Sequence, residues 1–518
     1  MIDPNTPVVI GVGQSVDRWD GTDAGIAPSP ISLAQRAASA ALADTGKPQA
    51  VGRAIDRVAV VRTMADSLPM GAGPFGRCAN PPATLAAGLG IEASALVYSC
   101  VGGEQPQTLV AEAAEAVFAG RTHAVLIAGG EATAALKTAI KRGVALDWSA
   151  STTGNFEDRG FGGPLLTAHE IAGGLGMPTT TYPAFENALR ARLGHSRAEH
   201  RRAMAELLSG FSQVAADNPY AQFPKARTAD FLATESTENY ALADPYLKWH
   251  VAQDAVNQGA AVVVTTVGRA TAMGVDSAKF VFLHGYAEVT DAPVLQRPDL
   301  SRSRAIEAVI GLALESAGRT AGDIAHLDLY SCFPCAILLA AEALGVDWRT
   351  RALTVTGGLP FFGGPGNNYA MHAIATLVER LRAERDAFGM VVATGGFLTK
   401  QAAGVYSAIP PTDWAPVSSG AIQRGLNATD LPPPLAEDAE GVIETYTVTM
   451  AKGVPSGGYA IAMTPKGRVL GRARSSDAAT IEEFCGTDPI GRRIRICHSD
   501  GRNMVEGFIA DAATALRD

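Results

Sequence analysis

The sequence is poor in cysteine and in charge for its length. Six cysteines are spread along 518 residues: Cys78, Cys100, Cys332, Cys335, Cys485 and Cys497. Their spacing fits neither a disulfide framework nor the paired ligands of a zinc site, so we expect no metal centre and a reducing, cytoplasmic location. Charged residues make up 18% of the chain and hydrophobic residues 47%. This composition excludes a chain that is disordered throughout and indicates large buried cores.

Long apolar runs and basic clusters are also absent. No uninterrupted apolar stretch approaches 18 residues, so no membrane span is expected. The N-terminus has no basic region followed by a cleavable apolar core, so no secretory signal is expected. A net charge of −9 without a clustered basic face argues against a nucleic-acid partner. Small molecules are therefore the expected partners.

A repeated order of elements runs through most of the chain. At 518 residues the chain exceeds the size of a single core, which predicts two or three domains. In the first half the residue pattern predicts a helix at 32–42, strands at 55–61 and 95–98, a helix at 107–118 and a strand at 123–128. The second half repeats this order at 305–317, 324–330, 352–355, 369–382 and 389–393. We predict a duplicated α/β fold built from βαβ units around parallel sheets.

An insertion at about residues 135–240 has no counterpart in the second half. Its basic residues include Lys137, Lys141, Arg142, Arg190, Arg192, Arg197, Arg201, Arg202, Lys225 and Arg227. We predict a loop domain whose basic helical face around 185–210 is either a solvated surface or a cradle for an anionic ligand, such as a phosphorylated cofactor. With this insertion the N-terminal half covers residues 1–275, and the C-terminal half covers residues 276–408.

The last part of the chain reads as a separate all-β unit. Prolines punctuate residues 409–435, which predicts a linker without periodicity. Beyond it, a strand at 443–448 and hairpins at 459–472 and 492–509 predict five or six short strands, and thus a small antiparallel β-barrel over residues 436–518. Binding of single-stranded nucleic acid through its arginines is disfavoured, because the aromatics are too few for a stacking platform.

Cys100 is the most informative single residue. It follows an apolar strand and precedes Gly102, Gly103 and a predicted helix. A thiol at a helix start meets unpaired amide groups and the positive end of the helix dipole, which favour thiolate and lower the thiol pKa. The same turn can offer N–H donors to a thioester oxyanion. The alternative is a buried, inert cysteine.

Four motifs in order resemble the thiolase superfamily. They are Tyr98-Ser99-Cys100-Val101-Gly102-Gly103, Asp328-Leu329-Tyr330-Ser331-Cys332-Phe333, the glycine-rich run from Gly357 to Gly366, and Val392-Ala393-Thr394-Gly395-Gly396. The resemblance covers about residues 5–407 and implies a five-layer αβαβα thiolase fold, in which Cys100 accepts an acyl group. The added barrel is similar to that of the thiolase-like proteins of type 1, relatives of the sterol-carrier-type thiolases.

The departures from the family pattern fall on the chemistry. Gly364 stands where thiolases have their catalytic histidine, Ala393 where they have a second cysteine, and Tyr330 where they have asparagine or histidine. Losing the base and the enolate donors should remove most of the rate of a Claisen condensation, so ordinary thiolase activity is not expected.

The resemblance nevertheless implies an acyl-CoA-handling acyltransferase of lipid metabolism with an atypical site. The candidate catalytic residues are Cys100 and Tyr330, and the candidate substrate-binding residues are Gly102, Gly103, Gly364, Gly395, Gly396 and Phe397. The thioester of coenzyme A is the expected substrate, no cofactor is expected to stay bound, and the chain is expected to be a monomer or a homodimer.

Two other functions remain open. One is a catalytically silent protein that binds acyl-CoA, and the other is a retro-aldolase in which the Tyr330 phenol shuttles a hydroxyl proton. A lone histidine on a helix is more often structural than catalytic, so His372, in the helix after the glycine-rich run, is expected to be structural. Cys332 and Cys335 have the spacing of a redox motif. The family segment that this region resembles already has a cysteine before its phenylalanine, so a disulfide role is not expected for the pair.

Overall fold

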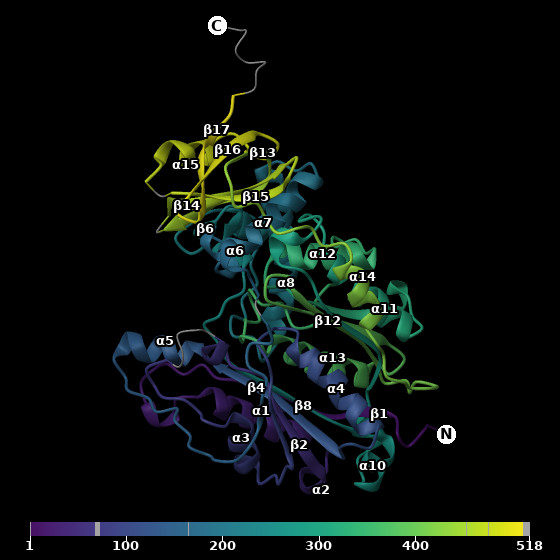
Figure 1. Cartoon of the computed structure of the whole chain (residues 1–518). Coiled ribbons are helices and arrows are strands. Elements are labelled where there is room, and N and C mark those ends of the chain that lie inside the picture. Colours follow the sequence, from purple (N-terminus) through teal and green to yellow (C-terminus); the bar gives the residue numbers. More distant parts are fainter. Residues whose placement is uncertain (1, 68–72, 164, 452, 475, 511–518) are drawn as a thin grey trace.

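Two sheets form the body of the molecule in the computed structural model, which describes residues 2–67, 73–163, 165–451, 453–474 and 476–510 (Figure 1). The first sheet holds β1 (Pro7–Val16), β2 (Ile55–Val60), β3 (Ala95–Tyr98), β4 (Ala124–Ala132), β5 (Glu157–Asp158) and β8 (Asn257–Thr266). The second holds β9 (Phe282–Thr290), β10 (Ile324–Leu329), β11 (Phe388–Gly395) and β12 (Lys400–Ser407). Their strand orders are β1-β8-β4-β2-β3-β5 and β9-β12-β11-β10.

The two sheets repeat one topology. Strands β1, β8, β4 and β2 take the same successive places as β9, β12, β11 and β10. In each sheet the last of these strands in the chain, β8 or β12, runs antiparallel to both of its neighbours. The other neighbouring pairs, β2 with β4 and β10 with β11, are parallel. The duplication is therefore confirmed, although the sheets are mixed, because the short connection from β11 to β12 can join only antiparallel strands.

Helices cover both faces of each sheet and give five layers (Figure 1). Between the sheets, and in contact with both, lie α4 (Gln105–Phe118) and α13 (Tyr369–Ala383). The outer layers contain α1 (Pro30–Asp44), α2 (Pro48–Ala54), α3 (Pro81–Leu89) and α10 (Val267–Ala272) on the first sheet, and α11 (Arg304–Ser316) and α12 (Pro334–Leu344) on the second. Strands β4, β8, β11 and β12 are buried at every residue, as expected for strands covered on both faces. Within the described ranges no helix is long and apolar enough to cross a membrane.

The insertion is mostly helical, and its part after residue 178 contacts the second half. It contains α5 (Thr133–Arg142), α6 (Ala168–Ala172), α7 (Pro178–Arg192), α8 (Arg197–Asp217), α9 (Ala229–Ala233), β6 (Ala241–Ala243) and β7 (Tyr246–Leu247). Buried Glu186 of α7 accepts from the Tyr246 hydroxyl at 2.8 Å and from the Cys335 amide at 2.7 Å. It also contacts His200 of α8 at 2.7 Å. One carboxyl group thus ties α7, α8, β7 and α12 together.

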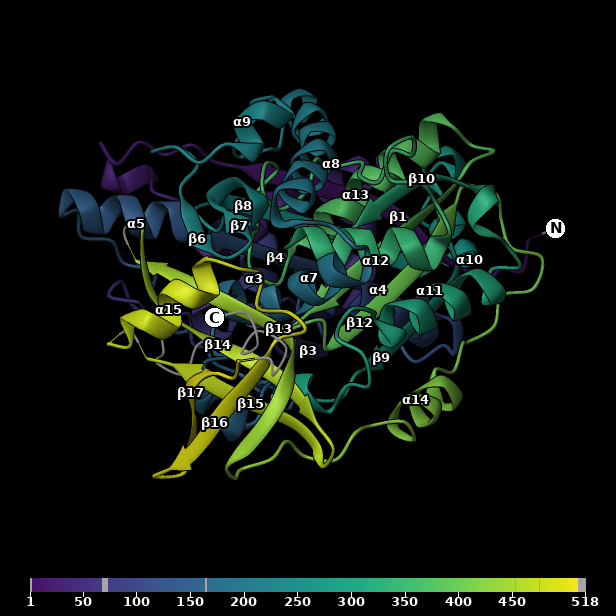
Figure 2. The ribbon, with the colours of Figure 1, turned by 90° about the horizontal axis from the view of Figure 1, so that it is seen from above.

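The C-terminal barrel is closed and has five strands: β13 (Ala439–Ala451), β14 (Val454–Thr464), β15 (Gly467–Ala473), β16 (Arg493–Ser499) and β17 (Arg502–Phe508). The ring runs β13-β14-β15-β17-β16 and back to β13, and α15 (Ala478–Cys485) connects β15 to β16. This order is that of the OB-fold. Seen from the barrel end in Figure 2, the barrel covers one side of the body, while α8 and α9 lie on the other. The expected antiparallel barrel is confirmed except that β15 and β17 pair in parallel.

Two expected features are wrong. Residues 352–355 form no strand, because the buried carboxylate of Asp328 accepts the amides of Val355 and Thr356 and draws this backbone out of a ladder. The stretch 409–435, read as free of periodicity, contains the helix α14 (Gly420–Asn427). This helix contacts α11 and β9, so packing on the body stabilises a segment that is short for an isolated helix.

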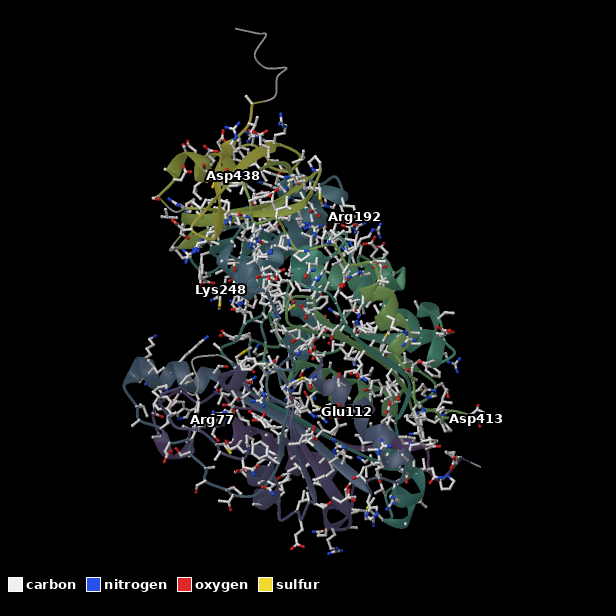
Figure 3. All side chains as sticks on the ribbon, in the orientation of Figure 1. Arg77, Glu112, Arg192, Lys248, Asp413 and Asp438 are labelled. Atoms are coloured by element: carbon white, nitrogen blue, oxygen red, sulfur yellow. The ribbon has the colours of Figure 1, made fainter. Side chains whose placement is uncertain are left out.

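The basic face of the insertion docks the barrel. Arg190 of α7 is 1% exposed and pairs with Asp488 through two bonds of 2.6 and 3.0 Å. Arg197 of α8 donates to the carbonyl oxygens of Phe484 and Cys485 at the end of α15. Arg192, labelled in Figure 3, pairs instead with the body. These three arginines bind groups of the protein itself. They form neither the solvated surface nor the cradle for an anionic ligand that the sequence predicted.

We expect Asp488→Ala to lower the free energy of unfolding by about 2 kcal/mol at pH 7, because it leaves the buried Arg190 without its partner. The cost stays below that of a fully buried pair, since the Asp488 side chain is 42% exposed. Burial alone would raise the pKa of Asp488, but the Arg190 guanidinium holds it below its ordinary value. The stabilisation is therefore full above the unfolded pKa of about 4 and is lost as the pH falls through the folded pKa.

Urea unfolding of both proteins at pH 7 and near pH 3 measures this difference. Glu440→Ala, which breaks only exposed pairs with Arg493 and Arg495, is the matched control and should cost less than about 1 kcal/mol. A deficit of Asp488→Ala that persists unchanged at low pH would contradict the ion pair as its cause.

Candidate active site

Cys100 lies where strand ends of the two halves meet. It is partly exposed and follows Tyr98, the last residue of β3, by two positions. A methyl group at Gly162 would lie 2.8 Å from Sγ of Cys100 and 3.1 Å from Nζ of Lys400, so the thiol and the ammonium group flank the same point. Lys400 begins β12, and its Nζ donates to the carbonyl oxygen of Val101 at 2.8 Å. The first half thus supplies the thiol and the second half the cation.

The segment over Cys100 is clamped to the middle layer. Arg159, which follows β5, donates through both Nη atoms to Glu112 of α4 at 2.7 and 2.9 Å. Figure 3 labels Glu112 in the body of the molecule. A bidentate pair of this kind fixes the geometry of both partners, so it holds the turn that contains Gly162 against the thiol. This turn therefore covers part of the thiol.

A buried carboxyl group, Glu104, lies close enough to Cys100 for its charge to act on the thiol. It is 4% exposed, and its Oε1 accepts from the Gln105 side chain at 2.8 Å, whereas its Oε2 has no hydrogen-bond partner within the described ranges. A methyl group at Gly102 or Gly395 would overlap this carboxyl group, so both glycines are needed to admit it. Burial raises the pKa of Glu104, although the charge of Lys400 opposes the rise. A carboxyl group whose pKa is raised holds a proton more readily than an exposed one, which suits it to exchange protons with a neighbouring group.

Tyr330 brings a phenol to the same place from the second half. It directly follows β10, is 7% exposed, and its hydroxyl lies so close to Gly103 that a methyl group there would overlap it. The ring packs edge-on against Tyr369 with centroids 5.4 Å apart. Burial, with the nearby Cys332 and Glu104, raises the pKa of Tyr330 well above its usual range. The phenol is therefore protonated at neutral pH and can act as a hydrogen-bond donor.

The expected lowering of the Cys100 pKa is wrong. Helix α4 begins at Gln105, so four residues separate the thiol from the first helical residue. Burial raises the pKa of the Cys100 thiol by more than the charge of Lys400 lowers it, and Glu104 adds to the rise. Formation of a thiolate here requires a proton acceptor, and the Glu104 carboxylate, whose charge acts on this thiol, has the right chemistry for that role.

The backbone of the two glycine-rich turns is largely engaged in structure. The Gly364 amide donates to the carbonyl oxygen of Gln253 at 2.8 Å, and no contact joins Gly364 to Cys100 in the described structure. The Gly102 amide donates to Oδ1 of Asn367 at 3.2 Å, so it does not point at a thioester oxygen. Gly102, Gly103 and Gly395 leave space for side chains at the site, and the engaged Gly102 amide is not free for the oxyanion role expected of the Gly102-Gly103 turn.

Gly396 and Phe397 face the loop domain. The carbonyl oxygen of Gly396 accepts from the Tyr182 hydroxyl at 3.1 Å, and that of Phe397 accepts from Arg297 at 2.9 Å. Tyr182 also accepts from the Cys332 thiol at 3.4 Å. These residues connect α7 to the loop after β11. In the described structure the hydrogen bonds of the two carbonyl oxygens are with Tyr182 and Arg297 and not with Cys100.

His372 and the cysteine pair are structural in this arrangement. His372 is fully buried, meets Oε1 of Gln14 at 2.8 Å, and burial lowers its pKa to about 3. Cys332 and Cys335 are free thiols, each beside a different tyrosine. In the described part of the chain no group of three or more His, Cys, Asp or Glu side chains is arranged to hold a metal ion.

Sequence reasoning missed Glu104 and Lys400. Each interrupts a stretch that the pattern assigns to the interior: Glu104 follows the Gly102-Gly103 pair at a helix start, and Lys400 opens a buried strand. A charged residue is rarely buried without a partner, so this position was the signal that could have identified both. Together with Cys100 and Tyr330 they bring a thiol, a carboxyl group, a phenol and an ammonium group to one region of the fold.

Comparison with solved structures identifies proteins that share this fold. The chain is 34% identical to a monomeric SCP2-thiolase-like protein type 1 from Mycobacterium smegmatis, over 98% of this chain and 100% of that one, with a TM-score of 0.83. An Ltp2–ChsH2(DUF35) aldolase matches at 17% identity over 78% of this chain and 98% of that one, with a TM-score of 0.56. An acetyl-CoA acetyltransferase from Syntrophomonas wolfei matches at 16% identity over 79% and 100%, with a TM-score of 0.56. The last two show the fold alone. No family model and no curated protein matches the sequence.

Proposed function

Since the chain belongs to the thiolase superfamily, in the group of SCP2-thiolase-like proteins of type 1, we propose that it is an acyl-CoA-handling acyltransferase in which Cys100 accepts the acyl group. One observation carries this proposal: a partly exposed thiol, a buried carboxyl group and a buried ammonium group meet at the junction of the two halves. A coenzyme A thioester is the substrate class, and no resident cofactor takes part.

The acyl transfer is a thiol–thioester exchange. The Cys100 proton moves to the Glu104 carboxylate while Sγ attacks the thioester carbonyl carbon. The bond from that carbon to the sulfur of coenzyme A then breaks, and Glu104 returns the proton to the departing thiolate. Lys400 favours the negative charge that develops near Cys100. An acceptor in the second half-reaction takes the acyl group from Cys100 by the reverse of these steps.

Condensation of two acyl groups is not part of the proposal. It needs a base that removes an α-proton, and the position expected to hold that base is Gly364, whose surroundings are Gln253, Ala252 and Leu359. Ala393 is fully buried within β11 and has no group that exchanges a proton. Acyl uptake without carbon–carbon bond formation is the reaction that the remaining groups support.

The test is intact-protein mass spectrometry after incubation with acetyl-CoA or palmitoyl-CoA. We expect one acyl adduct on the unaltered protein and none on Cys100→Ala. Cys485→Ala, which removes an exposed thiol outside the site, is the matched control and should keep the adduct. Binding of acyl-CoA without any adduct would overturn the proposal in favour of a silent carrier.

A second function, retro-aldol cleavage of a β-hydroxyacyl-CoA, is favoured by the placement of the Tyr330 hydroxyl near Glu104. The carboxylate would take the hydroxyl proton, the carbon–carbon bond would break to an aldehyde or ketone and an enolate, and the phenol would protonate that enolate. The proton held by Glu104 would then restore the phenol. Cleavage that survives Cys100→Ala but is lost in Tyr330→Phe would select this function over acyl transfer. Cleavage lost in neither variant would exclude both residues.

We infer that the chain is a monomer rather than a homodimer. The edge of β3 is covered by the chain's own β5, whose Asp158 is paired with Arg62, so pairing of this edge with a second copy is blocked. The similar protein from Mycobacterium smegmatis is itself described as monomeric. The mass of the purified protein in solution distinguishes one copy from two.

A further inference from the structure

A cleft of about 780 Å³ lies on the barrel, away from Cys100. It is lined by β14, β15 and the turn between β16 and β17, and Gly174 and Thr180 of the loop domain close one side. Its size falls in the range of small-molecule sites, about 300–1,000 Å³. In Figure 1, α6 and the strand β14 mark the place where the loop domain and the barrel meet.

Three arginines of the cleft have no partner in the described structure. Arg472, Arg474 and Arg502 line it, and none of them makes an ion pair or a side-chain hydrogen bond there. The other arginines in the described part of the barrel behave differently, because each pairs with a carboxylate: Arg468 with Glu444, Arg492 with Glu483, and Arg493 and Arg495 with Glu440. The unpaired guanidinium groups are thus gathered at one place.

The remaining lining also suits an anion. Only one carboxylate, Asp500, lines the cleft against the three guanidinium groups. The hydroxyls of Thr449 and Ser456 lie 3.2 Å apart at its wall, and the half-buried Gly458 lines it near them. Its aromatic residue Tyr459 is 1% exposed, so no ring is presented for base stacking. Charge, hydroxyls and glycine without stacking rings favour phosphate groups over single-stranded nucleic acid.

We propose that this cleft binds the adjacent phosphate groups of a nucleotide-sized ligand. Two sources share that chemistry: the nucleotide end of coenzyme A and a free nucleoside diphosphate. The first rests on the proposed function. It is supported by two positions: Gly162 adjoins Cys100, and the described segment 165–174 extends from Leu165, beside Gly396, to Gly174 at the cleft.

Calorimetric titration of the full chain with coenzyme A, adenosine diphosphate and pyrophosphate tests the proposal. We expect all three to bind, and the double variant Arg472→Gln, Arg474→Gln to weaken each by about 10- to 100-fold. The matched control, Arg493→Gln with Arg495→Gln, removes the same charge from the same domain and should change affinity less than about twofold. Both double variants alter exposed residues, so equal melting temperatures check that the fold is kept.

The measurements distinguish coenzyme A from a free nucleotide as the ligand, and they also show when the proposal is wrong. If coenzyme A is the ligand, the double variant raises the acyl-CoA concentration needed to acylate Cys100 without changing the maximal rate. If a free nucleotide is the ligand, acylation is unchanged while adenosine diphosphate binding is lost. Absence of phosphate binding, equal weakening by both double variants, or preferential binding of a single-stranded oligonucleotide would each overturn the proposal. These three contradicting results are read from binding alone, so they do not depend on whether Cys100 forms an adduct.

Discussion

Acylation of Cys100 is expected to slow by about 100- to 1,000-fold when Glu104 is replaced by glutamine, the range typical of a lost general base. The thiol pKa is raised by burial, so at neutral pH the nucleophile is protonated and its attack depends on a proton acceptor. Glutamine has nearly the same shape but cannot accept that proton. The rate is measured as the time course of the acyl adduct.

The pH dependence distinguishes this role from a change in structure. A general base acts when it is ionised, so the wild-type rate should rise with pH through the raised pKa of Glu104 and then level off. The variant should lose this step and follow only the ionisation of the thiol. Stability should not fall, because the substitution removes a buried charge whose Oε2 has no partner in the described structure.

Glu288→Gln is the matched control for Glu104→Gln. Glu288 lies on β9 and is close enough for its charge to raise the pKa of Glu104, but it is exposed and does not touch the thiol. Its replacement should leave the acylation rate within about twofold. If Glu104→Gln acylates at the wild-type rate, the proton acceptor is another group and the assignment of Glu104 is wrong.

The duplicated fold could be predicted because the local sequence pattern determines each of its strands and helices. Buried strands such as β4 and β11 are almost purely apolar, and glycine ends each series, so period and order alone identify two equivalent halves. The segment 352–355 could not be predicted in the same way. Its apolar pattern suits an edge strand, but a carboxylate distant in sequence competes for its amides, and that competition is tertiary.

In the candidate site too, local motifs could be read from the sequence, whereas features that depend on tertiary contacts could not. Motifs in the sequence point to Cys100 and Tyr330, and in the structure the charge of Glu104 acts on both groups. The pKa of Cys100 could not be predicted, since its direction depends on how deeply the thiol is buried, whereas the sequence shows only that a helix follows. Lys400 was missed because its role depends on a contact between halves, which no spacing within one half reveals.

Asp328→Ala is expected to lower the free energy of unfolding by about 4 kcal/mol, from the loss of several buried hydrogen bonds at one point. Asp328 is 1% exposed, and its Oδ2 accepts from the amides of Val355 and Thr356 at 3.0 and 3.1 Å, while its Oδ1 accepts from the Tyr369 hydroxyl at 3.0 Å. Alanine leaves these donors buried and unpaired, because water cannot reach them.

Because Asp328 stands two residues before Tyr330, the same change should also displace the phenol from the site, so any reaction that needs Tyr330 should fall together with stability. Urea unfolding measures the cost, with Asp386→Ala, an exposed aspartate, as the control within about 0.5 kcal/mol of wild type. Asp328→Asn should fall between the two, since the amide keeps one acceptor oxygen but turns a donor toward the other set of donors. A cost of less than about 1 kcal/mol for Asp328→Ala would show that the backbone at 354–356 finds other partners, and that this carboxylate does not hold the second half of the site in place.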